Sequence, residues 1–309
     1  MIGDEARMMS FSHDEIQAAG PAEGAALFVV RAAISPTDAG QLLAWTQELE
    51  ERLELGGRAW TVGRGRRLAG YATLDPVPGL PGVYDLEGGI VPARRRRGLG
   101  TMLLRHLQRE AAMADVRQLS CRVVGLQDAA AQFLLRRDFY VEHEECLLQL
   151  FDLDGLPPLP AGLPGEIKMF PLTQAVGEFV RVYEESFSAM PWSQPYAAAE
   201  VAAALARPED LLFAVVEGIA VGVVWHELLP DGRGRIEPIG IARRHQGRGL
   251  GRGLMLAALH DLRRRGARAV EIGLWRQNTP AMNLYKSLGF LEVANWYYLA
   301  CDPEGLKAE

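Results

Sequence analysis

The chain has 309 residues, of which 49% are hydrophobic, and its formal net charge is −6. This length is enough for two domains of ordinary size, each with a core of its own. The acidic balance argues against a nucleic-acid partner and against binding to anionic membranes, and no apolar run reaches about 18 residues. Three widely spaced cysteines form neither a disulfide framework nor a CxxC metal site. We therefore expect a cytoplasmic protein without a metal.

The first half of the chain begins with an aperiodic stretch, residues 1–25, which we expect to be a loose lead-in. Residues 26–33 are typical of a strand, and Ser35-Pro36-Thr37-Asp38 offers cap residues for a helix that runs to Glu54. The elements that follow are predicted as strands at 59–64, 67–74 and 83–90, a helix at 98–114, a strand at 117–124, a helix at 128–137 and further strand structure to Leu150.

A segment rich in proline and glycine, residues 152–165, is predicted to link two domains, 26–151 and 166–303. The second half repeats the order of the first. Its predicted elements are a strand at 166–170, a helix from Thr173, strands at 211–216, 220–227 and 235–241, a helix at 249–265, a strand at 268–275, a helix at 280–288 and terminal strands to Cys301. Each half is thus predicted to be α+β, with a mostly antiparallel sheet and helices on both faces.

A glycine-rich motif occurs in both halves at a constant offset. Arg95-Arg96-Arg97-Gly98-Leu99-Gly100 recurs as Gln246-Gly247-Arg248-Gly249-Leu250-Gly251, an offset of 246 − 95 = 151. The same offset relates Ile90 to Ile241 and Phe139 to Phe290. A register kept over this distance indicates an internal duplication.

Each copy of the motif lies between a predicted strand and a predicted helix, which is the setting of an anion site. The first N–H groups of a helix lack partners within it, and this end of the helix dipole is positive. Gly249 and Gly251 let the backbone approach phosphate oxygens, and Arg243, Arg244 or Arg248 can add charge-assisted hydrogen bonds. The alternative is a plain turn with solvated arginines, and two copies in register argue against it.

Residues 241–255 resemble motif A of the GNAT N-acetyltransferase superfamily, Gln/Arg-x-x-Gly-x-Gly/Ala, and residues 278–290 resemble its motif B. The first half matches motif A but matches motif B poorly. The resemblance implies two GNAT-like domains in tandem, with a degenerate first copy and with acetyl-CoA or another acyl-CoA as the donor substrate. It also assigns the donor-binding residues, which are Ile239, Gly240, Ile241, Gln246, Gly247, Arg248, Gly249, Leu250, Gly251, Asn278 and Asn283, together with Arg95, Arg97, Gly98 and Gly100 in the first copy.

Tyr285 is the candidate general acid. It lies on the short motif B helix, where the family places a tyrosine near the CoA sulfur, and a phenol stays protonated at neutral pH. The alternative is an aromatic residue packed in the core. At the offset of 151 the first half has Leu134, which cannot donate a proton, so we expect the first half to be non-catalytic.

Glu237 is the candidate general base, with Glu227 and His226 on the neighbouring strand as alternatives. Glu237 precedes Pro238, which has no N–H for a sheet ladder, so the strand should be bulged or unpaired there. The resemblance implies that this strand splays from its neighbour to admit the pantetheine arm of the donor. A carboxylate beside that gap can take the proton of the amine through a water molecule. A solvated strand glutamate is the plainer reading.

The acceptor is expected at the aromatic segment 187–196, where Trp192 and Tyr196 can stack on a substrate. The same side chains can instead clasp this loop onto the domain, and the sequence favours neither reading.

The sequence therefore predicts an N-acetyltransferase that moves an acetyl group from acetyl-CoA to a primary amine of a small molecule or peptide. Its C-terminal domain is expected to catalyse the reaction, in a monomer or homodimer with no nucleic-acid or membrane partner. The alternative is a non-catalytic tandem protein that binds or senses CoA or serves as a scaffold. A weaker possibility, a nucleic-acid patch at residues 94–97, is opposed by the net charge.

Overall fold

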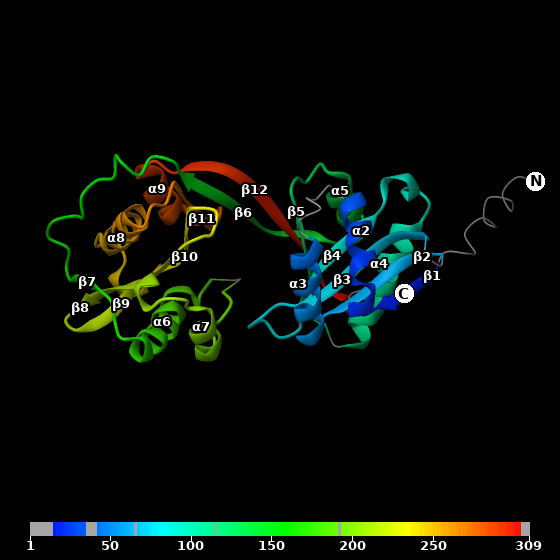
Figure 1. Ribbon diagram of the computed structural model, residues 1–309, viewed down its shortest axis with the longest axis horizontal. Helices are drawn as coiled ribbons and strands as arrows, with labels where there is room; N and C mark the ends of the chain where they lie inside the picture. The colour runs from blue at the N-terminus through cyan, green and yellow to red at the C-terminus, as the bar shows by residue number, and fades with distance from the viewer. Residues whose placement is uncertain (1–14, 35–41, 65–66, 115, 191–192, 304–309) are drawn as a thin grey trace, which may run out of the picture. The chain divides into compact units, whose positions relative to one another are not determined.

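The computed structural model describes residues 15–34, 42–64, 67–114, 116–190 and 193–303. The chain forms two compact units: residues 1–142 with 298–309, and residues 143–297. Figure 1 labels their helices and strands. No helix in the described ranges is both long and apolar enough to cross a membrane.

The first unit contains a sheet in the order β1-β2-β3-β4-β5. Its pairs are antiparallel except for β4 with β5. Its elements are β1 (Glu15–Ala19), α2 (Gly24–Ile34), α3 (Leu42–Glu54), β2 (Arg58–Arg64), β3 (Arg67–Pro76), β4 (Val83–Ile90), α4 (Leu99–Met113), β5 (Gln118–Val123) and α5 (Ala129–Leu135). Leu27, Trp45, Leu49 and Tyr71 pack between α2, α3 and the sheet.

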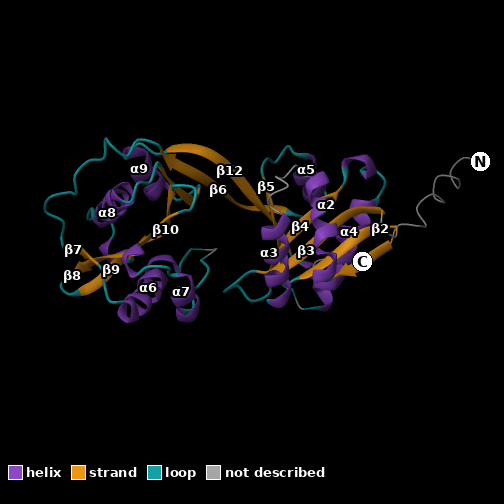
Figure 2. Ribbon diagram, viewed as in Figure 1, coloured by secondary structure: helices purple, strands orange, loops and turns teal. Residues whose placement is uncertain are grey.

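The second unit has the strand order β6-β11-β10-β9-β8-β7, with β10 and β11 parallel. Its elements are β7 (Glu166–Lys168), α6 (Leu172–Phe187), α7 (Ala198–Ala204), β8 (Leu211–Val216), β9 (Ile219–Leu228), β10 (Arg233–Ile241), α8 (Leu250–Arg264), β11 (Ala269–Trp275) and α9 (Thr279–Ser287). Figure 2 shows α6 and α8 on opposite sides of the sheet. The predicted α+β class, with a mostly antiparallel sheet, is confirmed.

Two long strands, β6 (Tyr140–Leu150) and β12 (Leu291–Cys301), contribute residues to both units. Residues 143–150 of β6 belong to the second unit, and residues 145–150 pair with β11. Residues 298–301 of β12 belong to the first unit, in which β12 neighbours β5. Each unit is therefore completed by a strand that lies in the other half of the sequence.

Two predictions for the start of the chain were wrong, and a third is described only in part. Residues 15–19 of the predicted loose segment form β1, an edge strand paired with β2. Residues 26–33, predicted as a strand, form most of α2. Leu27 and Val30 are buried at helical spacing, but a short apolar run hides this period. The helix predicted after Asp38 begins at Leu42, and Ser35–Asp38 lie outside the described residues.

The predicted linker, residues 152–165, has no regular secondary structure and lies within the second unit (Figure 2). Leu153 is buried in the core of that unit. Pro157 accepts a hydrogen bond of 2.9 Å from His260 on α8, and Asp154 pairs with Arg263 at 3.1 Å. The compact units thus differ from the predicted ranges 26–151 and 166–303, because the boundary falls inside β6 instead of in this segment.

Candidate active site

The glycine-rich loop of the second unit has the geometry of an anion site. Gly247 and Gly249 have φ angles of 74° and 82°, which a residue with a Cβ atom adopts only with strain. Gly249 is the N-cap of α8, and the first helical hydrogen bond runs from the Gly253 amide to its carbonyl. The amides of Leu250, Gly251 and Arg252 therefore precede the first bonded turn and are free to bind an anion.

The loop of the first unit has the same backbone. Gly98 has a φ of 81° and caps α4, as Gly249 caps α8. Arg95 Nε donates to the Ile90 carbonyl at 2.8 Å, and Gln246 Nε2 donates to the Ile241 carbonyl at 2.9 Å. These two side chains shape the loops from equivalent positions. For Gln246 this points to a structural role more than to direct contact with the donor.

The arginines of the second loop differ in whether they form ion pairs within the protein. Arg244 pairs with Glu185 at 3.7 Å. Arg243 and Arg248 are exposed, and no ion pair is seen for either in the described part of the chain. These two guanidinium groups are therefore the better placed to meet the charge of an incoming phosphate.

Strand β10 separates from β11 beyond Arg235. The two strands pair only from Arg233 to Arg235, although β11 continues to Trp275 in its ladder with β6. On its other side, β10 has a bulge against β9 between Ile236 and Ile239, where the predicted irregularity at Pro238 lies. Among the described residues, the β11 side of residues 236–241 has no strand partner, so it is open to a ligand.

Ile239, Gly240 and Ile241 occupy this open stretch while their other side pairs with β9. Gly240 is buried, and a Cβ atom there would lie 2.6 Å from a ring carbon of Phe187 and 2.9 Å from Ser186 Cβ. Glycine at this position therefore lets α6 pack closely on β10 and holds the open edge in place.

Glu237 lies at the point where the strands separate. Its Oε2 is 3.7 Å from the position that a Cβ atom would take on Gly273 of β11, so the carboxylate lies over that glycine. The residue is solvent-accessible, yet desolvation by the surrounding protein raises the pKa of its carboxyl. The negative charge of Glu145 raises this pKa further, whereas Arg235 opposes the shift. In the described part of the chain, Glu237 has no hydrogen bond and no close ion pair.

Tyr285 on α9 is buried, with 4% of its surface exposed, and packs against Phe290. Burial raises the pKa of its phenol, and the charge of Glu237 raises it further. The residue is therefore both a core aromatic and a protonated phenol close enough to Glu237 to be influenced by its charge. The two readings of Tyr285 that the sequence left open are compatible.

Two further residues predicted to bind the donor lie on or beside α9. The Asn278 side chain accepts a hydrogen bond of 3.3 Å from the Ala281 amide, so it caps the helix. Asn283 is exposed on the same helix. The side chain of Asn278 therefore has a structural role, whereas the side chain of Asn283 is available to bind the donor.

The aromatic segment packs against α6. Tyr196 contacts Phe179 and Tyr183 edge-on, with ring centroids 5.2 Å and 4.7 Å away. Burial raises the pKa of Tyr183, while Ser193 and the backbone of Gln194, which lie beside its hydroxyl, oppose this rise. Burial raises the pKa of Tyr196 to about 12, and Glu237 is among the charges that contribute to this shift. Tyr196 thus packs the segment against α6 and also lies near the candidate base, Glu237. Trp192 lies outside the described residues.

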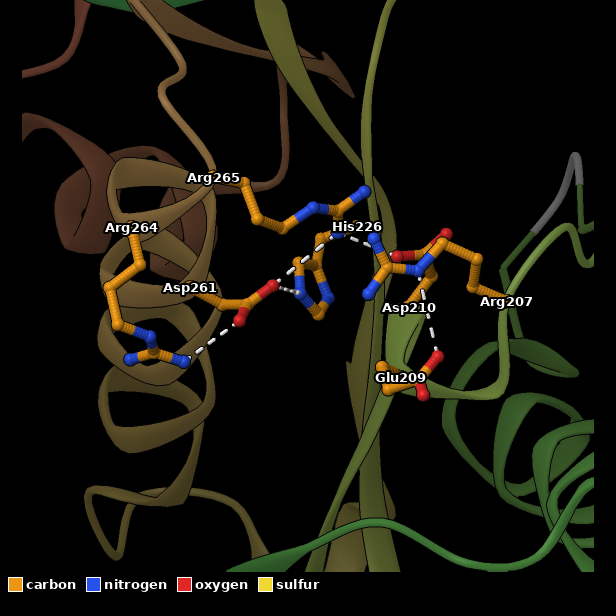
Figure 3. A network of polar contacts seen from close by, with 7 residues as sticks. All are labelled: Arg207, Glu209, Asp210, His226, Asp261, Arg264 and Arg265. Atoms are coloured by element: carbon orange, nitrogen blue, oxygen red, sulfur yellow. Dashed lines mark hydrogen bonds and ion pairs between the residues drawn. The ribbon is translucent and has the colours of Figure 1, made fainter.

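The alternative bases have partners of their own. His226 is fully buried, and its Nε2 lies 3.0 Å from Asp261 Oδ2 on α8. Figure 3 shows this pair within a network that also contains Arg265 and Asp210. Burial lowers the pKa of His226, although the hydrogen bond and charge of Asp261 oppose this shift. Glu227 is paired with Arg235. Of the three candidates, only Glu237 is unpaired.

The first unit lacks this arrangement. Strand register aligns Asp85 with Arg235, because each pairs with the equivalent residue of the neighbouring parallel strand. Glu87 is therefore the counterpart of Glu237. It accepts hydrogen bonds from Tyr71 Oη at 2.6 Å and Arg31 Nε at 2.9 Å.

These contacts, with the charge of Arg52, determine the state of Glu87. Burial alone would raise the pKa of this carboxyl, but the hydrogen bonds from Tyr71 and Arg31 and the nearby guanidinium charges keep it below its usual value. Leu134, at the position of Tyr285, is buried. The carboxylate is thus already neutralised, and the phenol is absent.

A family model for the acetyltransferase (GNAT) family matches residues 30–139 and 177–290. The chain belongs to the GNAT family. It is 34% identical over 234 residues to a mycothiol acetyltransferase of Thermomonospora curvata, which covers 74% of this chain and 76% of that protein. It is 30% identical over 303 residues to the mycothiol acetyltransferase of Geodermatophilus obscurus, covering 91% of this chain and 94% of that protein.

Solved structures share the tandem fold. A tandem GNAT protein from the clavulanic acid biosynthesis pathway aligns with a TM-score of 0.65 at 21% identity, covering 94% of this chain and 99% of that chain. A GCN5-related N-acetyltransferase from Sphaerobacter thermophilus gives 0.72 at 21% identity, covering 94% and 96%. The predictions of a GNAT N-acetyltransferase and of two GNAT-like domains in tandem are confirmed.

The sequence did not reveal Glu87, Glu145 or Tyr183 as residues of these sites. The constant offset of 151 placed Leu86 opposite Glu237, because the bulge in β10 shifts the register by one residue. Glu145 lies before the predicted linker and was therefore assigned to the other domain. The Trp296–Glu145 hydrogen bond, at 3.0 Å, connects it to the second unit.

Proposed function

We propose that the second unit of this acetyltransferase transfers the acetyl group of acetyl-CoA to a primary amine of a small molecule or peptide. The observation that carries the proposal is the unpaired carboxylate of Glu237 at the opening between β10 and β11, close enough for its charge to act on the phenol of Tyr285. The first unit has a neutralised Glu87 and a leucine at the two equivalent positions. We therefore assign it a non-catalytic role.

The loop from Gln246 to Gly251 binds the diphosphate of the donor through free amides and the helix dipole. The open edge of β10 holds the pantetheine arm and directs backbone amides at the thioester oxygen, where negative charge develops. Binding both substrates in this orientation supplies several kcal/mol of the barrier, on the order of 7 or more for well-aligned reactants. In the first unit, Arg95, Arg97, Gly98 and Gly100 form a second such loop.

In the proposed reaction, Glu237 and Tyr285 move the protons. Glu237 takes one proton from the ammonium group of the acceptor, directly or through water, and later releases it to solvent. The amine nitrogen then forms a bond to the thioester carbon, and the carbon–sulfur bond breaks with its electron pair on sulfur. Tyr285 donates its proton to the thiolate and regains one from the nitrogen as the amide forms. The products are the N-acetyl compound, CoA and one proton.

The names of the relatives suggest the first acceptor to test. We propose an amine related to mycothiol, with Trp192 and Tyr196 at the acceptor site. The protein is incubated with acetyl-CoA and either desacetylmycothiol or a panel of primary amines and short peptides. CoA and the N-acetyl product are measured by chromatography. We expect turnover with at least one acceptor and a loss of about 10²-fold in Glu237→Gln, as is usual for a general base.

Two outcomes would contradict the proposal. Unchanged turnover in Glu237→Gln would place the base elsewhere. Calorimetric binding of CoA without acetylation of any member of the panel would favour a non-catalytic, CoA-binding protein.

A further inference from the structure

Glu145 lies on the same face of the second sheet as Glu237. In the ladder of β6 and β11 it is opposite Trp275, two residues along β11 from Gly273, over which the Glu237 carboxylate lies. Side chains alternate between the faces of a strand, so the side-chain directions of Glu145, Gly273 and Trp275 agree. The charge of Glu145 is close enough to influence the carboxyl of Glu237.

Glu145 is held in place by two side chains of the second unit. Trp296 Nε1 donates to Glu145 Oε2 at 3.0 Å, and His143 Nε2 lies 3.4 Å from Glu145 Oε1. Both partners come from the strands that exchange between the halves of the sequence, β6 and β12. The position of this carboxylate is thus fixed by the fold itself.

Other carboxylates around this site are matched by arginine. Glu271 pairs with Arg233, and Glu227 pairs with Arg235. Glu237 has no such ion pair among the described residues, although it lies beside a second carboxylate, and the charge of Arg235, which pairs with Glu227, offsets this only in part. Two carboxylates placed close together repel each other, and a ligand with a positive charge relieves this repulsion.

In the first unit, the residue equivalent to Glu237 has arginine side chains beside it. There Arg31 from α2 places its Nε 2.9 Å from the carboxylate of Glu87, the counterpart of Glu237. Arg52 from α3 lies 3.4 Å from the other oxygen. Among the described residues of the second unit, no arginine forms an ion pair with Glu237, so the carboxylate is left to pair with a cation from outside the chain.

We propose that Glu237 and Glu145 together form a subsite for the ammonium group of the acceptor, in which Glu145 is a specificity-determining residue that selects amines carrying a positive charge. The inference rests on the proposed function. Glu145 holds the ammonium group beside Glu237, and Glu237 removes the proton. Neutral nucleophiles such as alcohols lack the charge that this pair recognises.

Removing the charge of Glu145 should lower the pKa of Glu237. The groups that face Glu237 are Glu145 on β6, Glu271 on β11, Arg235 on β10, and the phenols Tyr183, Tyr196 and Tyr285. Replacing Glu145 by glutamine deletes a like charge, so the pKa of Glu237 falls. Glu237 must be ionised to act as the base, so the acidic limb of the rate profile moves to lower pH.

The subsite is tested without turnover by carbon NMR of protein labelled at the glutamate carboxyl carbons. The Glu237 resonance is the one that is lost in Glu237→Gln. Methylammonium chloride is the probe, with sodium chloride at the same ionic strength as its control. We expect methylammonium to shift the resonance in the wild type and at least threefold less in Glu145→Gln. We also expect the titration midpoint of Glu237 to be lower in Glu145→Gln.

Glu144→Gln is the matched control, because Glu144 is the neighbouring residue on β6 and pairs instead with Arg276 and Asn295. It removes one negative charge and should leave both measurements for Glu237 unchanged. Glu145→Asp keeps the charge and should restore most of the wild-type behaviour. Equal responses in the wild type and Glu145→Gln, or equal losses in Glu144→Gln and Glu145→Gln, would overturn the proposal.

Enzyme kinetics distinguish a failure of the ammonium subsite from a failure of the proposed reaction. With an acceptor amine that the wild type acetylates, Glu145→Gln should raise the KM for the amine about tenfold, or about 1.4 kcal/mol, and leave the KM for acetyl-CoA unchanged. If methylammonium binds as described but no amine is acetylated, the subsite stands and the assigned reaction fails. If amines are acetylated with an unchanged KM in Glu145→Gln, the reaction stands and the subsite fails.

Discussion

At the scale of single residues, the duplicated units keep a common backbone and differ in the groups that carry chemistry. Arg96 has a φ of 61° where the second unit has Gly247 at 74°, and Asp138 has a φ of 62° where the second unit has Gly289 at 92°. A non-glycine residue in this region is strained by about 1 kcal/mol or more. The first unit therefore retains the loop conformations of the second with less suitable residues, while Leu134 replaces the phenol.

Tyr285→Phe tests the general acid. The phenyl ring preserves the packing against Phe290, so the fold and the affinity for CoA should be nearly unchanged. Loss of the hydroxyl should lower kcat about 10²-fold, in the range that is typical of proton transfer. Stopped assays of CoA formation and calorimetric titration with CoA measure the two quantities. A variant that turns over like the wild type would remove Tyr285 from the mechanism.

How far the site could be predicted from sequence depended on how local its signals are. Gly249 and Gln246 lie in one short motif, and Tyr285 lies in a second motif that resembles the family, so the sequence alone predicts all three as candidates. Glu145 is separated from Glu237 by about 90 residues of sequence, and only the exchange of β6 brings them together. Tyr183 looked like any aromatic residue on an amphipathic helix.

At the scale of secondary-structure elements, sequence patterns predicted β2 to α5 and β8 to α9 to within about two residues of their observed ends. These elements have clear apolar periods and glycine or proline boundaries. The pattern failed for α2, where an apolar run resembled a strand. The pattern of apolar residues does not show where β10 stops pairing with β11, because that depends on tertiary structure; the expectation that the strand splays rested on the resemblance to the family.

The network in Figure 3 joins α8 to the sheet of the second unit. Arg265 at the end of α8 donates to Asp210 at 2.6 Å, and the Asp210 side chain is almost fully buried. Asp210→Ala leaves this guanidinium without its main partner. The free energy of unfolding of the second unit should fall by about 2–3 kcal/mol in urea titration.

Glu209→Ala is the control for this variant. Glu209 pairs with Arg207, and about half of each side chain is exposed, at 52% and 51%. Exposed pairs contribute little, so the change should be below about 1 kcal/mol. Equal effects of Asp210→Ala and Glu209→Ala would mean that the network does not hold α8.

At the scale of the whole molecule, the two halves of the sequence are not two separable units. Residues 143–150 complete the second unit and residues 298–301 complete the first. A cut in segment 152–165 would separate Glu145 from Glu237 along the chain. The unit to which we assign catalysis therefore depends on a strand from the other half of the sequence. The first unit is needed at least as the source of that strand.

The most direct test of this account is the rate of acetyl transfer by Gly249→Glu compared with Gly98→Glu. The two glycines have φ angles of 82° and 81° and cap equivalent helices, so the backbone strain introduced is matched. Glutamate adds bulk and negative charge at the phosphate site of one unit at a time. We predict that Gly249→Glu abolishes acetyl transfer and that Gly98→Glu retains it. Activity retained in Gly249→Glu, or lost equally in both variants, would contradict catalysis by the second unit.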